Sequence, residues 1–313
     1  MTERGIPHVT ILLAVHNGAR YLPAQLQSFA DQTHRNWHLI ASVDGDEDNS
    51  RAVLQAFADK GHAVTVLDGP QQGAAANFLS LLMRMSRVVP GPSYLAFSDQ
   101  DDVWMPDRLS AGLSVLADID PEIPALFCAR QMITDETLAP LRVSMARPRP
   151  PGFRNALVQN IASGNTSLLN PTGARLLCAA AEEAGPIVMH DWWSYQIVTG
   201  AGGRVLHHET PLIYYRQHDH NAMGANTSPK AQASRLSMMV RGTYRHWMDL
   251  NVAALSRSAH RFTPRNRALL RRFKAMRHAP LPLRLWRFSR LRLYRQRRVG
   301  TAVLWLSVLL GRL

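Results

Sequence analysis

The chain has 313 residues, 46% of them hydrophobic and 19% charged, which excludes a disordered protein and allows one large domain or two ordinary ones. Two cysteines are too few for a disulfide framework, so a reducing cytoplasmic compartment is expected. The net charge of +13 suggests a nucleic-acid partner, but sixteen of the 36 basic residues follow Asp249, the last acidic residue. Up to and including Asp249, 20 basic side chains face all 23 acidic ones, so the basicity belongs to the tail.

The first hundred residues alternate apolar runs with helical patterns. Residues 8–15 predict a buried strand that ends at a His-Asn-Gly turn, and Leu22, Leu26 and Phe29 predict one face of a helix after it. The pattern continues with predicted strands at 37–43, 63–67 and 94–98 and predicted helices around 53–57 and 76–86. Such alternation predicts an α/β fold with a mostly parallel sheet and right-handed crossovers.

Ligands of such sheets bind beyond the carboxyl ends of the strands. The loops at 16–18, 44–50 and 99–102 are therefore expected to meet at one edge of the sheet. Two of these three loops are acidic, which is what a metal-dependent phosphate site requires.

The pattern is less regular after residue 124. A strand is expected at 123–129, a loop rich in Pro and Arg at 146–153, and a pair of strands within 204–216. From Ser234 onward the chain reads as helical and basic. We therefore divide it into a first domain at 1–233 and a basic, mainly helical C-terminal region at 234–313.

Three carboxylates crowd the end of the predicted strand at 94–98. Asp99, Asp101 and Asp102 repel one another and raise each other's pKa unless a cation or a proton intervenes. Asp99 and Asp101 carry oxygens suited to Mg²⁺ or Mn²⁺. A short Asp-X-Asp is weak evidence alone, because solvated loops contain it too, but here a second acidic loop follows the neighbouring strand.

At this point the sequence resembles the family 2 glycosyltransferases of the GT-A fold, and most closely the rhamnosyltransferase-like bacterial members. The resemblance covers about residues 8–224 and rests on the segments ILLAVHNGARYLPAQLQSFADQT, QQGAAANF, FSDQDDVWMPDRL, SGNTSLLN, HDWW and YRQHDHNAMG. It implies an inverting enzyme that uses Mn²⁺ or Mg²⁺. The implied reaction moves a sugar, rhamnose being one candidate, from a nucleoside-diphosphate sugar to a hydroxyl of a glycan or lipid-linked acceptor in cell-surface polysaccharide synthesis.

The resemblance also implies roles for residues on the donor side. Asp44 matches the carboxylate that reads the nucleotide, with Asp46 assisting, and Asn77 matches a position that supports the donor pocket. The reading of Asn77 as a polar residue near a helix start remains open. The residues that match the lining of the base and ribose are Ala14, His16 and Asn17.

Asp99 and Asp101 match the family's metal-binding Asp-X-Asp, with Asp101 the direct metal contact and Asp99 also facing the sugar or ribose. His218 resembles the C-terminal histidine that reaches back to the metal or the diphosphate. Asp102 is expected either behind these groups or as the cap of a helix that begins near Pro106.

Asp191 in HDWW matches the general base, which accepts the proton of the attacking hydroxyl. His190 beside it either tunes the site or packs. The residues expected on the acceptor side are Gly164, Asn165 and Trp192.

The basic tail mixes Arg with Leu, Trp, Phe and Tyr, which suits an anionic membrane surface. We expect a cytoplasmic protein attached peripherally to the inner face of the cell membrane, because no signal peptide is apparent and the apolar run at 299–311 is too short to cross a bilayer. Packing of the tail on the catalytic domain or on a partner is the alternative.

Two other functions remain as alternatives. A nucleic-acid-binding protein would explain the tail but leaves SDQDDVW and HDWW without a role, so no nucleic acid is expected. A metal-dependent nucleotidyltransferase predicts a Gly-rich, Lys-bearing loop after the first strand, where this chain has AVHNGARY.

Overall fold

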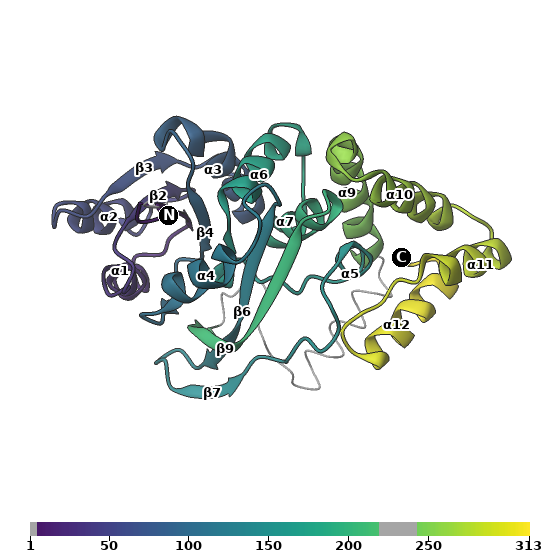
Figure 1. Ribbon diagram of the computed structural model, residues 1–313. Helices are drawn as coiled ribbons and strands as arrows, with labels where there is room; N and C mark the ends of the chain where they lie inside the picture. The colour runs from purple at the N-terminus through teal and green to yellow at the C-terminus, as the bar shows by residue number, and fades with distance from the viewer. Residues whose placement is uncertain (1–4, 219–242) are drawn as a thin grey trace.

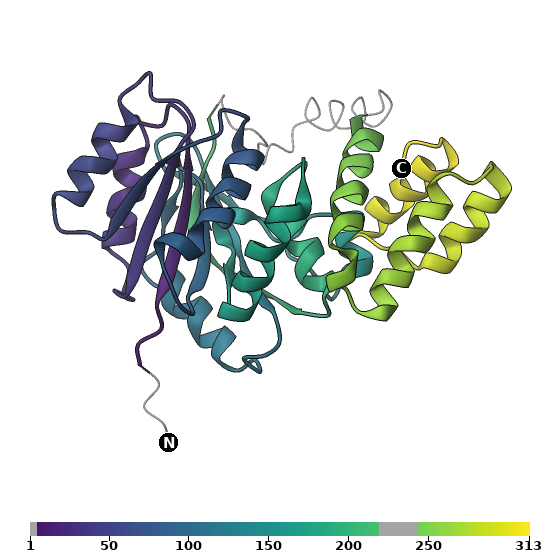
Figure 2. The ribbon, with the colours of Figure 1, turned by 90° about the horizontal axis from the view of Figure 1, so that it is seen from above.

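The computed structural model describes residues 5–218 and 243–313. The expected domain boundary at 233/234 and the last six residues of YRQHDHNAMG lie outside the described residues. The described part forms one mixed sheet covered by helices on both faces, with a stack of C-terminal helices at one end (Figures 1 and 2).

Four parallel strands form the first half of the sheet, as the sequence predicts. The order is β3-β2-β1-β4, from β1 (Val9–Val15), β2 (Trp37–Val43), β3 (Val64–Asp68) and β4 (Tyr94–Ser98). The crossovers contain α1 (Leu22–Ala30), α2 (Ser50–Ala58) and α3 (Ala74–Val88). Side chains of β1 alternate between two cores: Ile11 and Leu13 face α1 and α2, while Leu12 faces α3.

The second half of the sheet is mixed. It continues from β4 through β8 (Leu168–Leu169), β6 (Ala125–Thr134), β9 (Arg204–Arg216) and β5 (Val103–Trp104), and β7 (Pro140–Val143) pairs with β6. β8 runs antiparallel to both β4 and β6, so β4 and β6 point the same way. The helices of this half are α4 (Arg108–Ala117), α5 (Phe153–Ala156), α6 (Pro171–Ala184) and α7 (His190–Gly200).

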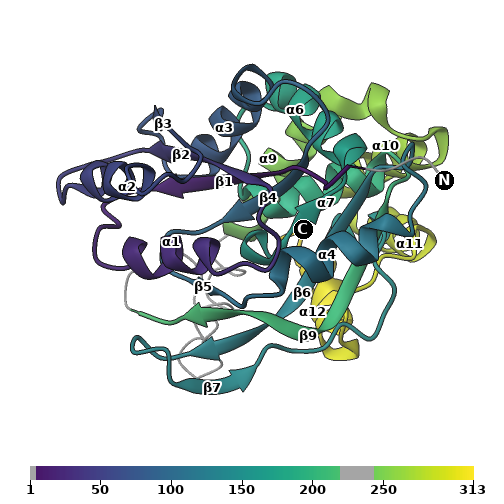
Figure 3. The ribbon, with the colours of Figure 1, turned by 60° about the vertical axis from the view of Figure 1, so that its left-hand side comes forward.

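The predicted pair of strands within 204–216 is wrong, because β9 is one strand that runs beside β6 (Figure 3). The pairing changes register between His208, opposite Ala129, and Pro211, opposite Arg130. Proline has no backbone N–H to donate, so strands that contain one commonly bulge there. The charged and polar residues before Pro211 are typical of a turn, and for this reason the sequence predicted two strands.

The C-terminal region is helical, as expected. It contains α9 (Thr243–Arg257), α10 (Pro264–Arg277), α11 (Leu281–Leu291) and α12 (Arg298–Leu309). Phe288, Leu304 and Val308 are buried in the same core cluster as side chains of α6 and α7. The tail therefore packs on the α/β region. Within residues 5–218 and 243–313, no helix combines the length and apolar character that crossing a bilayer demands.

Candidate active site

The three loops predicted to converge do lie together. Asn17 N donates to Gly45 O at 3.3 Å, and Gly18 N donates to Ser50 Oγ at 2.8 Å. Gln100 holds the loop after β1 on its other side: its Oε1 accepts from His16 N at 2.8 Å and its Nε2 donates to His16 O at 3.0 Å. Sequence reasoning assigned Gln100 no role.

The acidic loop after β2 stabilises the loop after β1. Asp48 Oδ2 accepts from Ala19 N at 2.7 Å, and Glu47 Oε2 accepts from Asn17 Nδ2 at 2.6 Å. Partial burial opposes the charge of Asp48, but hydrogen bonds from Ser50 and Ala19 outweigh it and lower the pKa of this carboxyl. These two acids, left unassigned from the sequence, shape the donor-side loop.

Asp44 is nearly buried at the end of β2, where its carboxylate accepts hydrogen bonds from the backbone N–H groups of Gln71 and Gly73. The approach of Gly69 is so close that a Cβ there would lie 2.5 Å from Asp44 Oδ1. Asp44, which the sequence predicts to contact the nucleotide, is thus held by the loop that precedes α3.

Two other donor-side residues make structural contacts. Asp46 Oδ1 accepts from Arg51 N at 2.7 Å in the first turn of α2. Asn77 Nδ2 donates to Ser42 O at 3.0 Å, while Asn77 Oδ1 is buried and has no partner among the described residues. Asn77 therefore ties α3 to β2, and Ala14 lies half-buried near the end of β1.

Three acids meet at the carboxyl end of β4. Burial, followed by the charges of Asp101 and Asp191, raises the pKa of Asp99 to about 8. Asp101 Oδ2 lies 2.8 Å from His218 Nε2, and both side chains are largely buried. The predicted Asp-X-Asp, base and C-terminal histidine thus come together from β4, α7 and the end of β9.

Asp102 lies behind this cluster and is fully buried. It accepts hydrogen bonds from Asn165 Nδ2 at 2.6 Å and from Arg216 N at 3.3 Å. Burial and the charges of Asp101 and Asp99 raise the pKa of Asp102. The alternative that Asp102 caps a helix is wrong, because Asp107 occupies the N-cap of α4.

Asp191 lies in the first turn of α7, where backbone donors surround its carboxylate. Its Oδ2 accepts from Gly164 N at 3.1 Å and its Oδ1 from Trp192 N at 2.6 Å. A Cβ on Gly164 would lie 2.4 Å from His190 Nε2, so only glycine fits beside the carboxylate. The site fixes the orientation of Asp191 with two N–H groups and the positive end of a helix dipole.

His190 packs in the core. Its ring stacks on Phe78 with centroids 3.6 Å apart, and burial lowers its pKa to about 4 against the opposing effect of Asp191. The imidazole is therefore neutral near pH 7.

Two predicted acceptor contacts are buried instead. Trp192 is 3% exposed and donates from Nε1 to Ala156 O at 2.7 Å, and Asn165 is 3% exposed and bonds to Asp102 and Gln131. The sequence identifies the residues of each motif, but it does not show which of their side chains are buried and which are exposed.

Further site residues were missed from the sequence. The Tyr21 ring stacks on the His218 ring with centroids 4.8 Å apart. Arg108 is buried over the ring of Trp104 and donates to the carbonyls of Asn165 and Ser167. Burial lowers the pKa of Arg108 to about 9, against the opposing charge of Asp102. Arg108 lies within the quoted segment FSDQDDVWMPDRL, but an arginine on a helix face is normally read as exposed.

The donor set fits a divalent ion that binds few protein groups. Among the described residues, no group of three His, Cys, Asp or Glu side chains is arranged to hold a metal. The raised pKa of Asp99 nevertheless marks a place where negative charge lacks compensation, next to the Asp101–His218 pair. Such a site suits an ion that takes its remaining ligands from phosphate oxygens and water.

The chain is similar in sequence to known glycosyltransferases. The sequence profile described as "Glycosyl transferase family 2" matches residues 10–168. The chain is 23% identical over 247 residues to the dTDP-rhamnosyl transferase RfbG of Shigella flexneri, a match that spans 74% of this chain and 81% of that protein. It is 26% identical over 108 residues to the UDP-Glc:alpha-D-GlcNAc-diphosphoundecaprenol beta-1,3-glucosyltransferase WfgD of Escherichia coli, covering 34% of this chain and 40% of that one.

A solved structure shares the fold. The mannosyltransferase PcManGT from Pyrobaculum calidifontis, in complex with GDP-Man and Mn²⁺, superimposes with a TM-score of 0.50 at 16% identity. The match covers 99% of this chain and 86% of that one.

Proposed function

Because the chain belongs to glycosyl transferase family 2 and is a nucleotide-sugar glycosyltransferase with the GT-A fold, we propose that it transfers a sugar with inversion to an acceptor hydroxyl. The observation that carries this proposal is the convergence of Asp99, Asp101, Asp191 and His218 at the carboxyl edge of the sheet. Donor, metal and base sites of one displacement reaction would then share a single edge.

Asp101 and His218 would hold Mn²⁺ or Mg²⁺, with Asp99 beside them. When bound, the ion would offset the charge of the departing diphosphate. The loop after β1, with His16 and Asn17, and the buried Asp44 would line the nucleoside side. Asp46 and Asn77 would support these loops from α2 and α3.

Asp191 would act as the general base. Its two backbone donors, one on each carboxylate oxygen, hold the carboxylate in one orientation. A sugar hydroxyl is a weak nucleophile near pH 7, and proton transfer to a placed carboxylate accelerates its attack. Gly164 is buried, and its N–H donates to Asp191, so it would position the base from the predicted acceptor side.

The transferred sugar and the acceptor are finer proposals. The likeness to a dTDP-rhamnosyl transferase supports rhamnose from a nucleoside-diphosphate donor. The likeness to an enzyme named for a diphosphoundecaprenol acceptor supports a lipid-linked glycan in bacterial surface polysaccharide synthesis. An enzyme with such an acceptor would work in the cytoplasm on the inner face of the membrane, and the basic tail supports attachment there.

The proposal is tested with a panel of nucleoside-diphosphate sugars, including dTDP-rhamnose, and Mn²⁺ or Mg²⁺. We expect slow metal-dependent release of nucleoside diphosphate from at least one donor, lost with EDTA and with Asp101→Ala. Asp118→Asn, an exposed carboxylate at the end of α4, is the matched control and should keep full activity. If no sugar nucleotide is bound or turned over with either metal, the proposal is wrong.

A further inference from the structure

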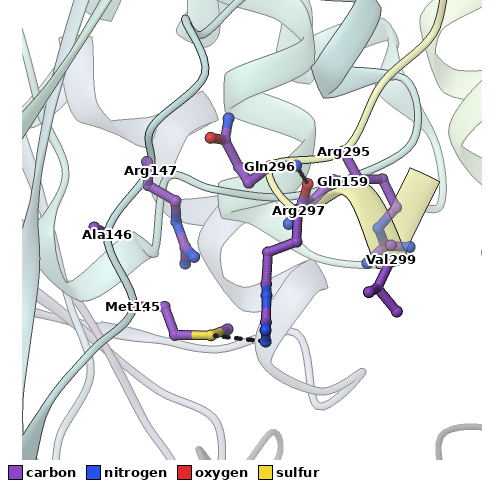
Figure 4. A pocket seen from close by; sticks show the side chains of 9 residues that line it. Met145, Ala146, Arg147, Gln159, Arg295, Gln296, Arg297 and Val299 are labelled. Atoms are coloured by element: carbon purple, nitrogen blue, oxygen red, sulfur yellow. Dashed lines mark hydrogen bonds between the residues drawn. The ribbon is translucent and has the colours of Figure 1, made fainter. Parts of the chain in front are cut away.

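A cavity of about 270 Å³ lies where the chain after β7 meets the start of α12 (Figure 4). None of its nine lining residues is acidic, and three are arginines, Arg147, Arg295 and Arg297. Val299 and Gly300, also in the lining, belong to the first turn of α12, where backbone N–H groups give the helix end a partial positive charge. The cavity therefore favours an anion.

Arg147 and Arg297 have N–H groups that lack a strong hydrogen-bond acceptor within the described chain. Arg147 Nε is buried and has no hydrogen-bond partner among the described residues. Glu209, the nearby acid, already pairs with Arg130 at 3.5 Å. Arg297 Nη1 lies 3.9 Å from Met145 Sδ, which is a weak acceptor. A buried guanidinium nitrogen without a partner is costly, and an anionic ligand would satisfy it.

The wall of the cavity is fixed to the α/β region before any ligand binds. The Gln296 side chain accepts from Arg149 N at 2.9 Å and donates to Arg149 O at 3.0 Å. Gln296 N donates to Gln159 Oε1 at 2.8 Å, and Arg149 Nη1 donates to Arg295 O at 3.0 Å. A preformed site loses little conformational entropy when it binds.

An apolar stripe begins at the same place. Residues 299, 303, 306 and 310 share one side of α12, and their side chains, Val299, Val303, Leu306 and Leu310, are 69%, 39%, 43% and 53% exposed. The other side of α12 packs into the core through Leu304 and Val308. Val299 both lines the cavity and starts the stripe, so a ligand in the cavity has an exposed apolar surface beside it.

We propose that Arg147, Arg295, Arg297 and the N-terminus of α12 bind the phosphate of an anionic bilayer lipid while the α12 stripe lies against its acyl chains. The proposal rests on the membrane attachment included in the proposed function and gives it a specific site. Charge complementarity selects a phosphate, and the adjoining stripe selects one that carries an apolar chain. A soluble phosphate would leave the stripe without a role.

The test compares co-sedimentation of the full chain with phosphatidylglycerol-containing vesicles and with phosphatidylcholine vesicles. We expect binding to the anionic vesicles only, and a loss of about tenfold or more in Arg147→Gln/Arg297→Gln, since each basic residue near an anionic surface contributes about 1 kcal/mol. The matched control is Arg271→Gln/Arg272→Gln, which removes the same charge from exposed sites on α10 that do not line the cavity.

A second variant tests the stripe without changing charge. Val303→Ser/Leu306→Ser should also weaken vesicle binding, and thermal unfolding verifies that each variant is folded. Equal losses of vesicle binding in the cavity variant and in the α10 control would overturn the proposed site, because the overall positive charge of the protein would then explain the binding. Calorimetric binding of inorganic pyrophosphate without any vesicle binding would also overturn it, in favour of a soluble ligand. No sugar nucleotide is present, so this outcome is independent of whether the enzyme transfers sugar.

Discussion

Asp191 is the residue whose chemistry the proposed mechanism depends on most. Gly164 N and Trp192 N donate to different oxygens of Asp191, so Asp191→Asn keeps the acceptor for only one of them, and it cannot accept a proton. We expect kcat for transfer to fall by about 10²–10⁴, the usual contribution of a general base, with little change in donor affinity. The measurement pairs a transfer assay with calorimetric titration of the donor. Loss of donor binding instead would assign Asp191 to the donor site.

The crowding at Asp99 predicts how pH affects the metal-free protein. Its pKa is raised from 3.8 to about 8 in the folded state, so the folded protein holds a proton there that the unfolded chain releases. The stabilising contribution is full below pH 4 and is lost as pH rises to about 8. Urea unfolding in EDTA should therefore show a free energy of unfolding that falls across this range.

Asp99→Asn removes one of the two buried carboxyls whose pKa is raised, so this decline should become shallower, while Asp118→Asn should leave it unchanged. An identical pH profile for wild type and Asp99→Asn would show that Asp99 is not the strained carboxylate. Saturating Mn²⁺ should reduce the decline in the wild type, because a cation compensates the charges that repel one another.

At the scale of elements, the sequence predicted the secondary structure of the long, apolar segments well. The runs that became β1 and β2 are almost wholly buried, and such runs predict strands of a covered sheet. The two-residue strands β5 and β8 were not predicted, because pairs such as Leu168–Leu169 carry no periodicity and become strands only through their neighbours. Tertiary pairing, absent from local sequence, decides these elements.

The site residues, like the elements, divide into those that local sequence predicts and those that depend on tertiary contacts. The acids at strand ends and at the start of α7 could be found from residue type and position. The burial of Trp192, the hydrogen bond from Asn165 to Asp102 and the burial of Arg108 could not, because each depends on contacts between segments far apart in the sequence. Trp192 donates to Ala156 O in α5, and Asn165 lies in η1 (Gly164–Thr166). Sequence patterns show what a residue is and which element holds it, but not which neighbour it faces.

For the whole molecule, the tail should unfold together with the α/β region. Phe288 on α11 is 2% exposed within the main core, whereas Trp286, two residues earlier, is 57% exposed. Phe288→Ala should lower the free energy of unfolding by about 3–5 kcal/mol, as expected for a large side chain removed from a core. Trp286→Ala should change it by at most about 1 kcal/mol.

Both variants should unfold in a single transition by circular dichroism and by tryptophan fluorescence. Two separate transitions, with only one of them shifted by Phe288→Ala, would make the tail an independent unit. The shared core also means that deleting residues after Arg277 exposes apolar surface, so point substitutions are the sounder way to study the tail.

Gln100, just after β4, links the ends of β1 and β4 through hydrogen bonds from its side chain. Its amide engages both backbone groups of His16, and a Cβ on Gly18 would lie 2.4 Å from Gln100 Oε1. A shift of the segment that carries Asp99 and Asp101 is therefore coupled, through Gln100, to the segment that is predicted to face the nucleoside. Both halves of a bound donor would then act on one connected unit of the protein, and a fragment that supplied only one half would still influence the geometry at the other.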